Sequence, residues 1–257
     1  AIACSHATAE QESKLHIVSK FGIQYKNLKF DQSVTGALKA KGGVSEGLMG
    51  ASGSLTAAYG EYFSSIKLEQ TLDSSGSSSD VPYAVAPTDI SRSDIVLTIG
   101  YRIYKAISIF AGYLNGETNI EPNSKNSGTG ISGNLGAFQS SYEQTYTENG
   151  WFIGSSYGLK IANAGQLSFG IAYANMDAKY EDNFTADPFD FNGTADGLSI
   201  STTWTANISK NLDYYVDLRY QQYDADFDTD STGSFAKVNV NTEETISSLS
   251  AGLQYVF

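Results

Sequence analysis

The sequence of 257 residues contains a single cysteine, only four prolines and no apolar run near the roughly 18 residues that a membrane-spanning helix needs. The single cysteine, Cys4, excludes an internal disulfide. The missing apolar run excludes a helical membrane protein. The length alone allows one large β domain or two small ones.

Basic residues are also scarce, with 16 lysines and arginines against 28 aspartates and glutamates, which gives a net charge of −12. This balance argues against nucleic acid as a partner, because nucleic-acid binding needs a basic surface. Histidine is rarer still: the chain has only His6 and His16, and His16 lacks the neighbours that would make it a metal ligand. No cofactor is therefore predicted, apart from the calcium considered below.

Tyrosine, phenylalanine and glycine are plentiful, and apolar residues recur at every second position along most of the chain. Such alternation is typical of strands with one apolar and one polar face. It predicts about ten strands, over residues 15–25, 49–59, 62–72, 95–103, 107–113, 151–159, 167–173, 198–204, 212–220 and 249–257.

The apolar faces of these segments carry no Asp, Glu, Lys or Arg, and the charged strand residues all lie on the other face. A charge that faces lipid costs about 2–4 kcal/mol at the bilayer midplane, so a membrane would enforce this separation. The core of a soluble β-sandwich would enforce it too. The aromatic residues favour lipid, because they gather at strand ends as headgroup-level rings do. One end has Tyr25, Tyr113, Trp151, Tyr173 and Tyr220, and the other has Tyr59, Tyr62, Tyr101, Tyr214, Tyr255 and Phe257.

The connections alternate between short and long. Short ones are predicted near residues 60, 104–106, 160–165 and 209–211, and long ones near 30–47, 73–93, 115–148, 181–197 and 224–244. With an even number of antiparallel strands, all short turns fall at one rim of a barrel and all long loops at the other.

These features together resemble the bacterial outer-membrane β-barrel proteins. The stretch "LSAGLQYVF" at the end of the chain is similar to the closing-strand signal of that class, a terminal phenylalanine preceded by alternate apolar residues. The resemblance implies an all-β, antiparallel up-and-down transmembrane barrel over residues 14–257, in the cell envelope of a Gram-negative bacterium, with short periplasmic turns and long extracellular loops. It also implies contact with outer-membrane lipid and lipopolysaccharide, and assembly by the barrel-assembly machinery through Phe257. It leaves the oligomeric state open. A secreted, soluble lectin or sandwich remains the alternative.

Residues 1–13 are expected to form a periplasmic tail or a signal remnant. "SHA" and "ATA" both resemble signal-peptidase sites. "AIAC" loosely resembles a lipoprotein box around Cys4, and an inert cysteine in a flexible tail is the third possibility.

Enzymatic activity is not expected. An omptin-type protease would suit ten strands, but it needs a histidine at the external rim, and the predicted loops have none. "GSSYG" matches a serine-hydrolase motif around Ser156, but it lies in mid-strand rather than at a strand-to-helix turn. "GTGISG" at 128–133 matches a dinucleotide motif only in spelling, because no strand precedes it and no helix follows.

The polar face predicts a narrow passive pore for small polar or charged solutes. Many of its residues are small, and it carries charges of both signs, which tune selectivity in diffusion pores. The predicted pore-lining residues are Lys20, Lys67, Glu69, Asp94, Arg102, Asp213, Asp217 and Arg219. The alternative is a lumen closed by salt bridges, in a barrel that acts through its loops as an adhesin, a receptor or a partner-binding surface. The alternate carboxylates Asp224, Asp226, Asp228 and Asp230 suggest a possible calcium-binding loop, with a solvated acidic loop as the default.

Overall fold

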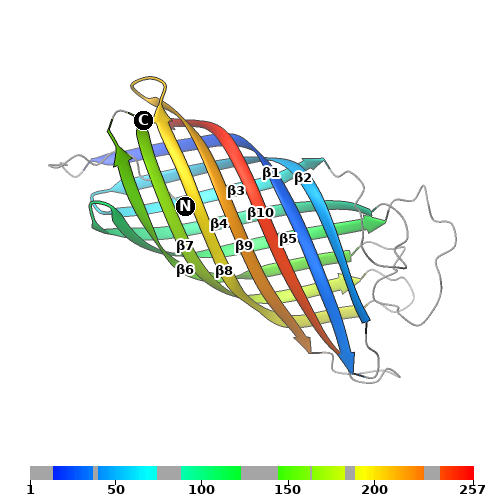
Figure 1. Ribbon diagram of the computed structural model, residues 1–257. Helices are drawn as coiled ribbons and strands as arrows, with labels where there is room; N and C mark the ends of the chain where they lie inside the picture. Colours follow the sequence, from blue (N-terminus) through cyan, green and yellow to red (C-terminus); the bar gives the residue numbers. More distant parts are fainter. Residues whose placement is uncertain are drawn as a thin grey trace.

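The structure is a computed structural model that describes residues 14–36, 40–73, 88–122, 144–162, 164–182, 189–228 and 238–257. These residues form one closed barrel of ten strands (Figure 1). The strands are β1 (Leu15–Gly36), β2 (Ala40–Tyr59), β3 (Tyr62–Asp73), β4 (Thr88–Tyr104), β5 (Ile107–Pro122), β6 (Gln144–Ile161), β7 (Gly165–Asp182), β8 (Phe189–Asn207), β9 (Leu212–Asp228) and β10 (Val238–Val256).

Each strand pairs antiparallel with its neighbours in sequence, and β1 pairs with β10 to close the barrel. The closing register runs from Val18 opposite Val256 to Gly36 opposite Val238. Closure leaves no sheet edge, which is what a β structure in lipid requires. The predicted ten-strand up-and-down barrel is therefore confirmed. Among the described residues no helix is long and apolar enough to span a membrane.

The two rims of the barrel differ. The turns at 60–61, 105–106, 162–164 and 208–211 lie at one rim, together with both ends of the barrel segment, and we call this the short-turn rim. Figure 1 shows the C label at that end, and we call the opposite rim the long-loop rim. The tight turn at Gly60 has a φ of 59°, which glycine adopts without strain.

The strands run further toward the long-loop rim than the sequence predicts. The predicted connection at 30–47 is wrong, because β1 extends to Gly36 and β2 begins at Ala40. The predicted loop at 224–244 is likewise mostly strand, since β9 ends at Asp228 and β10 begins at Val238. Strands of up to 22 residues far exceed the 9–11 or so that cross a bilayer.

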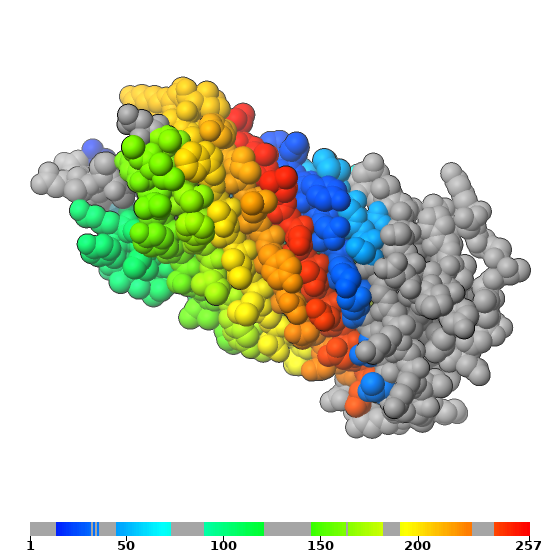
Figure 2. Space-filling view, viewed as in Figure 1, coloured from blue at the N-terminus to red at the C-terminus, as the bar shows by residue number. Residues whose placement is uncertain are grey.

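The five upper aromatic residues, Tyr25, Tyr113, Trp151, Tyr173 and Tyr220, divide the strands into two parts. Toward the short-turn rim, in what we call the lower half, the outer face is apolar and open to the surroundings, with Phe21 69% exposed. Toward the long-loop rim, in the upper half, the outer face is polar. The upper outer face carries Asn149, Asn175, Asp177, Asp196, Asp224 and Asp226. Figure 2 shows the outer wall of β7 to β10 and β1 as a continuous surface.

Inside the upper half, apolar side chains fill the lumen. One cluster joins Leu28, Leu48, Ile90 and Ile246. A larger one joins Leu114, Tyr146, Ala174, Met176, Ala178, Tyr180, Ala195, Tyr223, Ala225, Phe227 and Val240. The Tyr146 ring packs edge-on against Phe30 at 5.1 Å and Phe227 at 6.1 Å. These two clusters, which we call the upper core, give the upper half a packed interior.

Inward glycines in the lower half are covered by aromatic rings from neighbouring strands. The ring of Phe63 lies over Gly100, and the ring of Phe152 lies over Gly112, each occupying the space of a missing Cβ. The small inward residues therefore admit large neighbours, and they leave less open lumen than their size alone predicts.

Candidate functional site in the barrel lumen

All eight predicted pore-lining residues belong to the inward face of the barrel, because each falls in the register positions that alternate with the lipid-facing row. They come from four strands: Lys20 from β1, Lys67 and Glu69 from β3, Asp94 and Arg102 from β4, and Asp213, Asp217 and Arg219 from β9.

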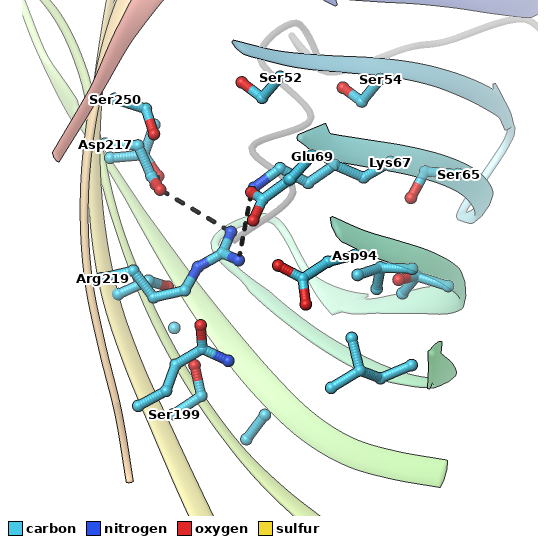
Figure 3. Close-up of a pocket in the computed structure, with 18 of the residues that line it drawn as sticks. Ser52, Ser54, Ser65, Lys67, Glu69, Asp94, Ser199, Asp217, Arg219 and Ser250 are labelled. Atoms are coloured by element: carbon cyan, nitrogen blue, oxygen red, sulfur yellow. Dashed lines mark hydrogen bonds and ion pairs between the residues drawn. The ribbon is translucent and has the colours of Figure 1, made fainter. Parts of the chain in front are cut away.

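Five of the eight meet near mid-lumen, where Lys26 of β1 joins them. The Lys26 ammonium lies 2.5 Å from an Asp94 carboxylate oxygen and 2.7 Å from one of Glu69. Glu69 also pairs with Lys67 on its own strand. Arg219 reaches across the lumen from β9 to within 3.8 Å of Glu69, and it lies 3.8 Å from Asp217 (Figure 3).

A second centre lies directly above, around the buried Arg92 of β4. Its guanidinium donates to Asp94 at 2.9 Å and to Glu244 of β10 at 2.5 Å, and it lies 3.4 Å from Glu148 of β6. It also donates to the Thr118 hydroxyl at 3.1 Å. Strands β4 and β6 are separated only by β5, and β10 stands four strands away from each around the barrel, so the pairing of Arg92 with Glu244 spans the lumen.

These contacts form one connected network, which we call the charged layer: Lys26, Lys67, Glu69, Arg92, Asp94, Glu148, Asp217, Arg219 and Glu244. The layer joins four cations to five carboxylates. Burying charges is costly unless each is paired and hydrogen-bonded, and most of these groups meet that condition. Two groups are less well satisfied: one oxygen of Glu244 is buried without a hydrogen-bond partner, and both ion pairs described for Arg219 are 3.8 Å long.

The charged layer and the upper core fill the upper lumen with buried side chains. Arg92 is 2% exposed, and Glu148 and Glu244 are 0% exposed. A cavity of about 160 Å³ adjoins the layer, mostly on its lower side, and its walls include Lys67 and Arg219 of the layer and reach Leu114 and Tyr223 of the upper core.

Arg92, Glu148 and Glu244 are not among the predicted site residues, because the predicted loops include them. A signal for them exists: the alternation continues past the upper aromatic residues, but there the apolar residues face inward and the polar residues face outward. On β9 the inward Tyr223, Ala225 and Phe227 are buried, while Asp224 and Asp226 are exposed between them.

The other three predicted residues lie nearer the short-turn rim. Lys20 sits 5.3 Å from the centre of the Tyr215 ring. Arg102 lies 3.5 Å from Glu61 of the turn after β2. Asp213 accepts hydrogen bonds from Asn207 at 2.7 Å and Gln254 at 3.0 Å. None of these contacts joins the charged layer among the described residues.

The predicted calcium-binding loop is wrong as a loop. Asp224, Asp226 and Asp228 lie on β9, and Asp230 falls outside the described residues. The alternate spacing is that of a strand whose outer face is polar. Within the described ranges, no group of three or more His, Cys, Asp or Glu side chains is arranged to hold a metal ion. Ser156 lies on β6, inside the barrel, and the residues of "GTGISG" fall outside the described part, as do Cys4 and His6.

No protein-family model matches this chain, and no curated protein matches it in sequence. Solved structures do match. The outer membrane protease OmpT of Escherichia coli superposes with a TM-score of 0.65 at 14% identity, over 94% of this chain and 97% of that one. The fold is that of the bacterial outer-membrane β-barrels. OprG of Pseudomonas aeruginosa gives a TM-score of 0.46 at 11% identity over 95% and 97%, and Ail of Yersinia pestis gives 0.34 at 10% over 93% and 99%.

At such identities the likeness is one of fold, and it is carried by OmpT. The lower half is then the transmembrane part, since the exposed apolar band of the lower half lies between the two groups of aromatic residues at the strand ends, which we call the upper and lower aromatic girdles. The likeness transfers no activity, so the absence of enzymatic activity stays a prediction. The soluble sandwich is excluded, because the structure is a single closed barrel whose lower outer face is apolar.

Proposed function

We propose that this chain is an outer-membrane barrel that is closed to solutes at rest and acts at its upper outer wall as a partner-binding surface. The observation that carries the proposal is the charged layer, which crosses the lumen beneath a packed upper core. A diffusion pore needs a continuous wet path, and the pairing of Arg92 with carboxylates of β4, β6 and β10 supports an interruption of that path.

The upper outer wall supports the second half of the proposal. Asp196 of β8 lies directly opposite Asp224 of β9, which lies opposite Glu243 of β10. Like charges facing each other across strands destabilise a sheet, so this acidic row has a cost that folding alone does not explain. It favours a partner with a basic surface, bound above the membrane.

Planar-bilayer recording tests closure. The wild-type barrel should give no discrete conductance steps over many insertions, and a variant with Arg92→Ala, Tyr146→Ala and Tyr223→Ala should give them, because it empties both the layer and the upper core. Lys29→Ala, on the outer face, is the matched control and should stay silent. Regular steps from the wild type would overturn the proposal.

Binding of an oligolysine peptide to the barrel in nanodiscs tests the outer wall. The triple variant Asp196→Asn, Asp224→Asn, Glu243→Gln should bind more weakly at low salt, since steering by exposed charge falls with ionic strength. Glu61→Gln, an exposed carboxylate at the short-turn rim, is the control and should bind as the wild type does. Equal binding by the triple variant would remove the acidic row from the function.

The narrow pore is the second candidate, and the cavity is the observation that favours it. Lys67, Asp217 and Arg219 line the cavity, with charges of both signs. In this reading the upper lumen rearranges to conduct, and Lys67→Gln with Arg219→Gln lowers anion permeability. Unchanged ion selectivity in conducting wild-type channels would count against it.

A further inference from the structure

We infer that the cavity beneath the charged layer is a binding site for a small oxyanion, a carboxylate or phosphate of few atoms, held by Arg219 and Lys67. The cavity of about 160 Å³ has room for such a ligand and is too small for an oligosaccharide or a peptide. This inference does not depend on whether the barrel conducts or binds a partner, because the cavity lies inside the barrel and away from the upper outer wall.

The first support is that the cavity wall presents cations and withdraws carboxylates. The side chain of Lys67 is 24% exposed and that of Arg219 is 15% exposed. The lining carboxylates are less exposed, with Asp217 at 10%, Asp94 at 7% and Glu69 at 6%. These exposed fractions are measured in a barrel interior, so the exposed area is cavity surface. An entering ligand therefore meets ammonium and guanidinium groups first.

The second support is that the carboxylates are already satisfied and Arg219 is not. Glu69 contacts Lys26 at 2.7 Å as well as Lys67, and Asp217 accepts a hydrogen bond from Thr203 at 2.5 Å. Both contacts described for Arg219 are 3.8 Å long, beyond hydrogen-bonding distance. Its planar fork of donors matches a carboxylate or phosphate in two-point fashion.

The third support is that Asp94, the remaining carboxylate on the cavity wall, is also engaged. It is held from above by Lys26 at 2.5 Å and by Arg92 at 2.9 Å, so each carboxylate of the wall already has a strong partner.

Hydroxyl groups complete the site. Figure 3 shows Ser52 and Ser54 on one wall and Ser199 and Ser250 on the other, around the guanidinium of Arg219. Hydroxyls rotate to donate to an oxyanion, so they suit ligands of slightly different shape. Between the cavity and the short-turn rim the inward residues Arg102, Ser156 and Gly158 are only partly buried.

The test is calorimetric titration of the folded barrel in detergent with inorganic phosphate, and separately with acetate, in a zwitterionic buffer of low ionic strength. The wild type should bind at least one of the two saturably at one site. Stronger binding of acetate would assign the ligand as a carboxylate, and stronger binding of phosphate as a phosphate. Absence of saturable binding for both would overturn the inference.

Variants locate the site. Arg219→Gln should weaken binding by about tenfold or more, since it removes a charged two-point donor. Arg219→Lys, which keeps the charge and is the safer variant for folding, should fall between. Asp217→Asn should tighten binding by removing a competing carboxylate, and Lys29→Gln on the outer face should change nothing. Wild-type affinity in both Arg219 variants would overturn the inference.

Discussion

The upper and lower halves of the barrel are made by the same ten strands, yet their inner and outer faces exchange character at the upper aromatic girdle. Below it, Phe21 and Ile99 face outward while Lys67 and Ser54 face inward. Above it, Asp224 faces outward and Phe227 is buried inside. The backbone alternation never breaks, so the surroundings, lipid below and water above, decide which face is apolar.

The exchange has a structural consequence for the lumen. In water the upper half folds as a soluble β domain does, by burying an apolar core. In lipid the lower half gains nothing from apolar packing inside, so its interior can remain polar and hold a cavity. The charged layer lies where the two regimes meet, with the upper core above it and the cavity below. The predictions that follow test this comparison, from the largest expected effect to the smallest.

Removing Arg92, the central cation of the charged layer, should lower the free energy of unfolding most. Arg92→Met leaves the carboxylates of Asp94, Glu148 and Glu244 buried without their common partner, and we expect a loss of about 3–5 kcal/mol. Unfolding in urea, with the barrel in lipid vesicles, measures it. The control Lys29→Met breaks an exposed pair with Asp31 and should cost about 0–1 kcal/mol.

A second variant in the same place sharpens the result. Glu244→Gln should be much milder than Arg92→Met, because the charged layer has one carboxylate more than it has cations. If both variants lose equal stability, pairing of charge is not what holds the layer together.

A charge placed on the outer face should lower stability in the lower half of the barrel and leave it almost unchanged in the upper half. Ile99→Arg puts a guanidinium into the apolar band of β4, where lipid contact costs about 2–4 kcal/mol. Ser91→Arg, on the same strand and the same face but in the upper half, should change stability by less than about 0.5 kcal/mol. Equal costs for the two, in the same vesicle assay, would contradict the assignment of lipid to one half and water to the other.

Ring-over-glycine packing in the lower half gives a smaller effect. Gly100→Ala places a methyl group where the Phe63 ring now lies, and overpacking of this kind costs about 1–3 kcal/mol. Gly53→Ala is the matched control, because its nearest neighbour would be 3.9 Å away. It should be neutral, or slightly stabilising through the unfolded chain. Thermal unfolding of both variants in detergent compares them directly. A Gly100→Ala variant as stable as the wild type would mean that the Phe63 ring can move to another position without cost.

Much of this fold could be predicted from the sequence. The ten strands, the antiparallel order and the aromatic girdles all follow from period-2 alternation, and every charge predicted to face the lumen belongs to the inward face. The upper half does not follow in this way, because alternation shows which face is apolar but not whether that face points outward or inward. Where the pattern reverses near Tyr220, alternation alone predicts the end of the strand and a loop at Asp224 and Asp226. The packing of the upper lumen is not predictable either, because it depends on long-range contacts such as Arg92 with Glu244, 152 residues apart.

The smallest effect concerns the acidic row on the upper outer wall, and its sign is the informative part. Asp224→Asn removes one of the carboxylates that face each other on β8, β9 and β10, so it should raise stability by about 0.2–1 kcal/mol. Asp226→Asn, two residues further along β9 on the same face, should not stabilise, because Asp226 accepts a hydrogen bond from Asn241 at 2.8 Å. The gain at Asp224 should shrink as salt is added, since exposed charges are screened within about 10 Å at 0.1 M. A destabilised Asp224→Asn variant would mean that the row is held by favourable contacts rather than retained against repulsion, and the argument for a basic partner above the membrane would lose its energetic basis.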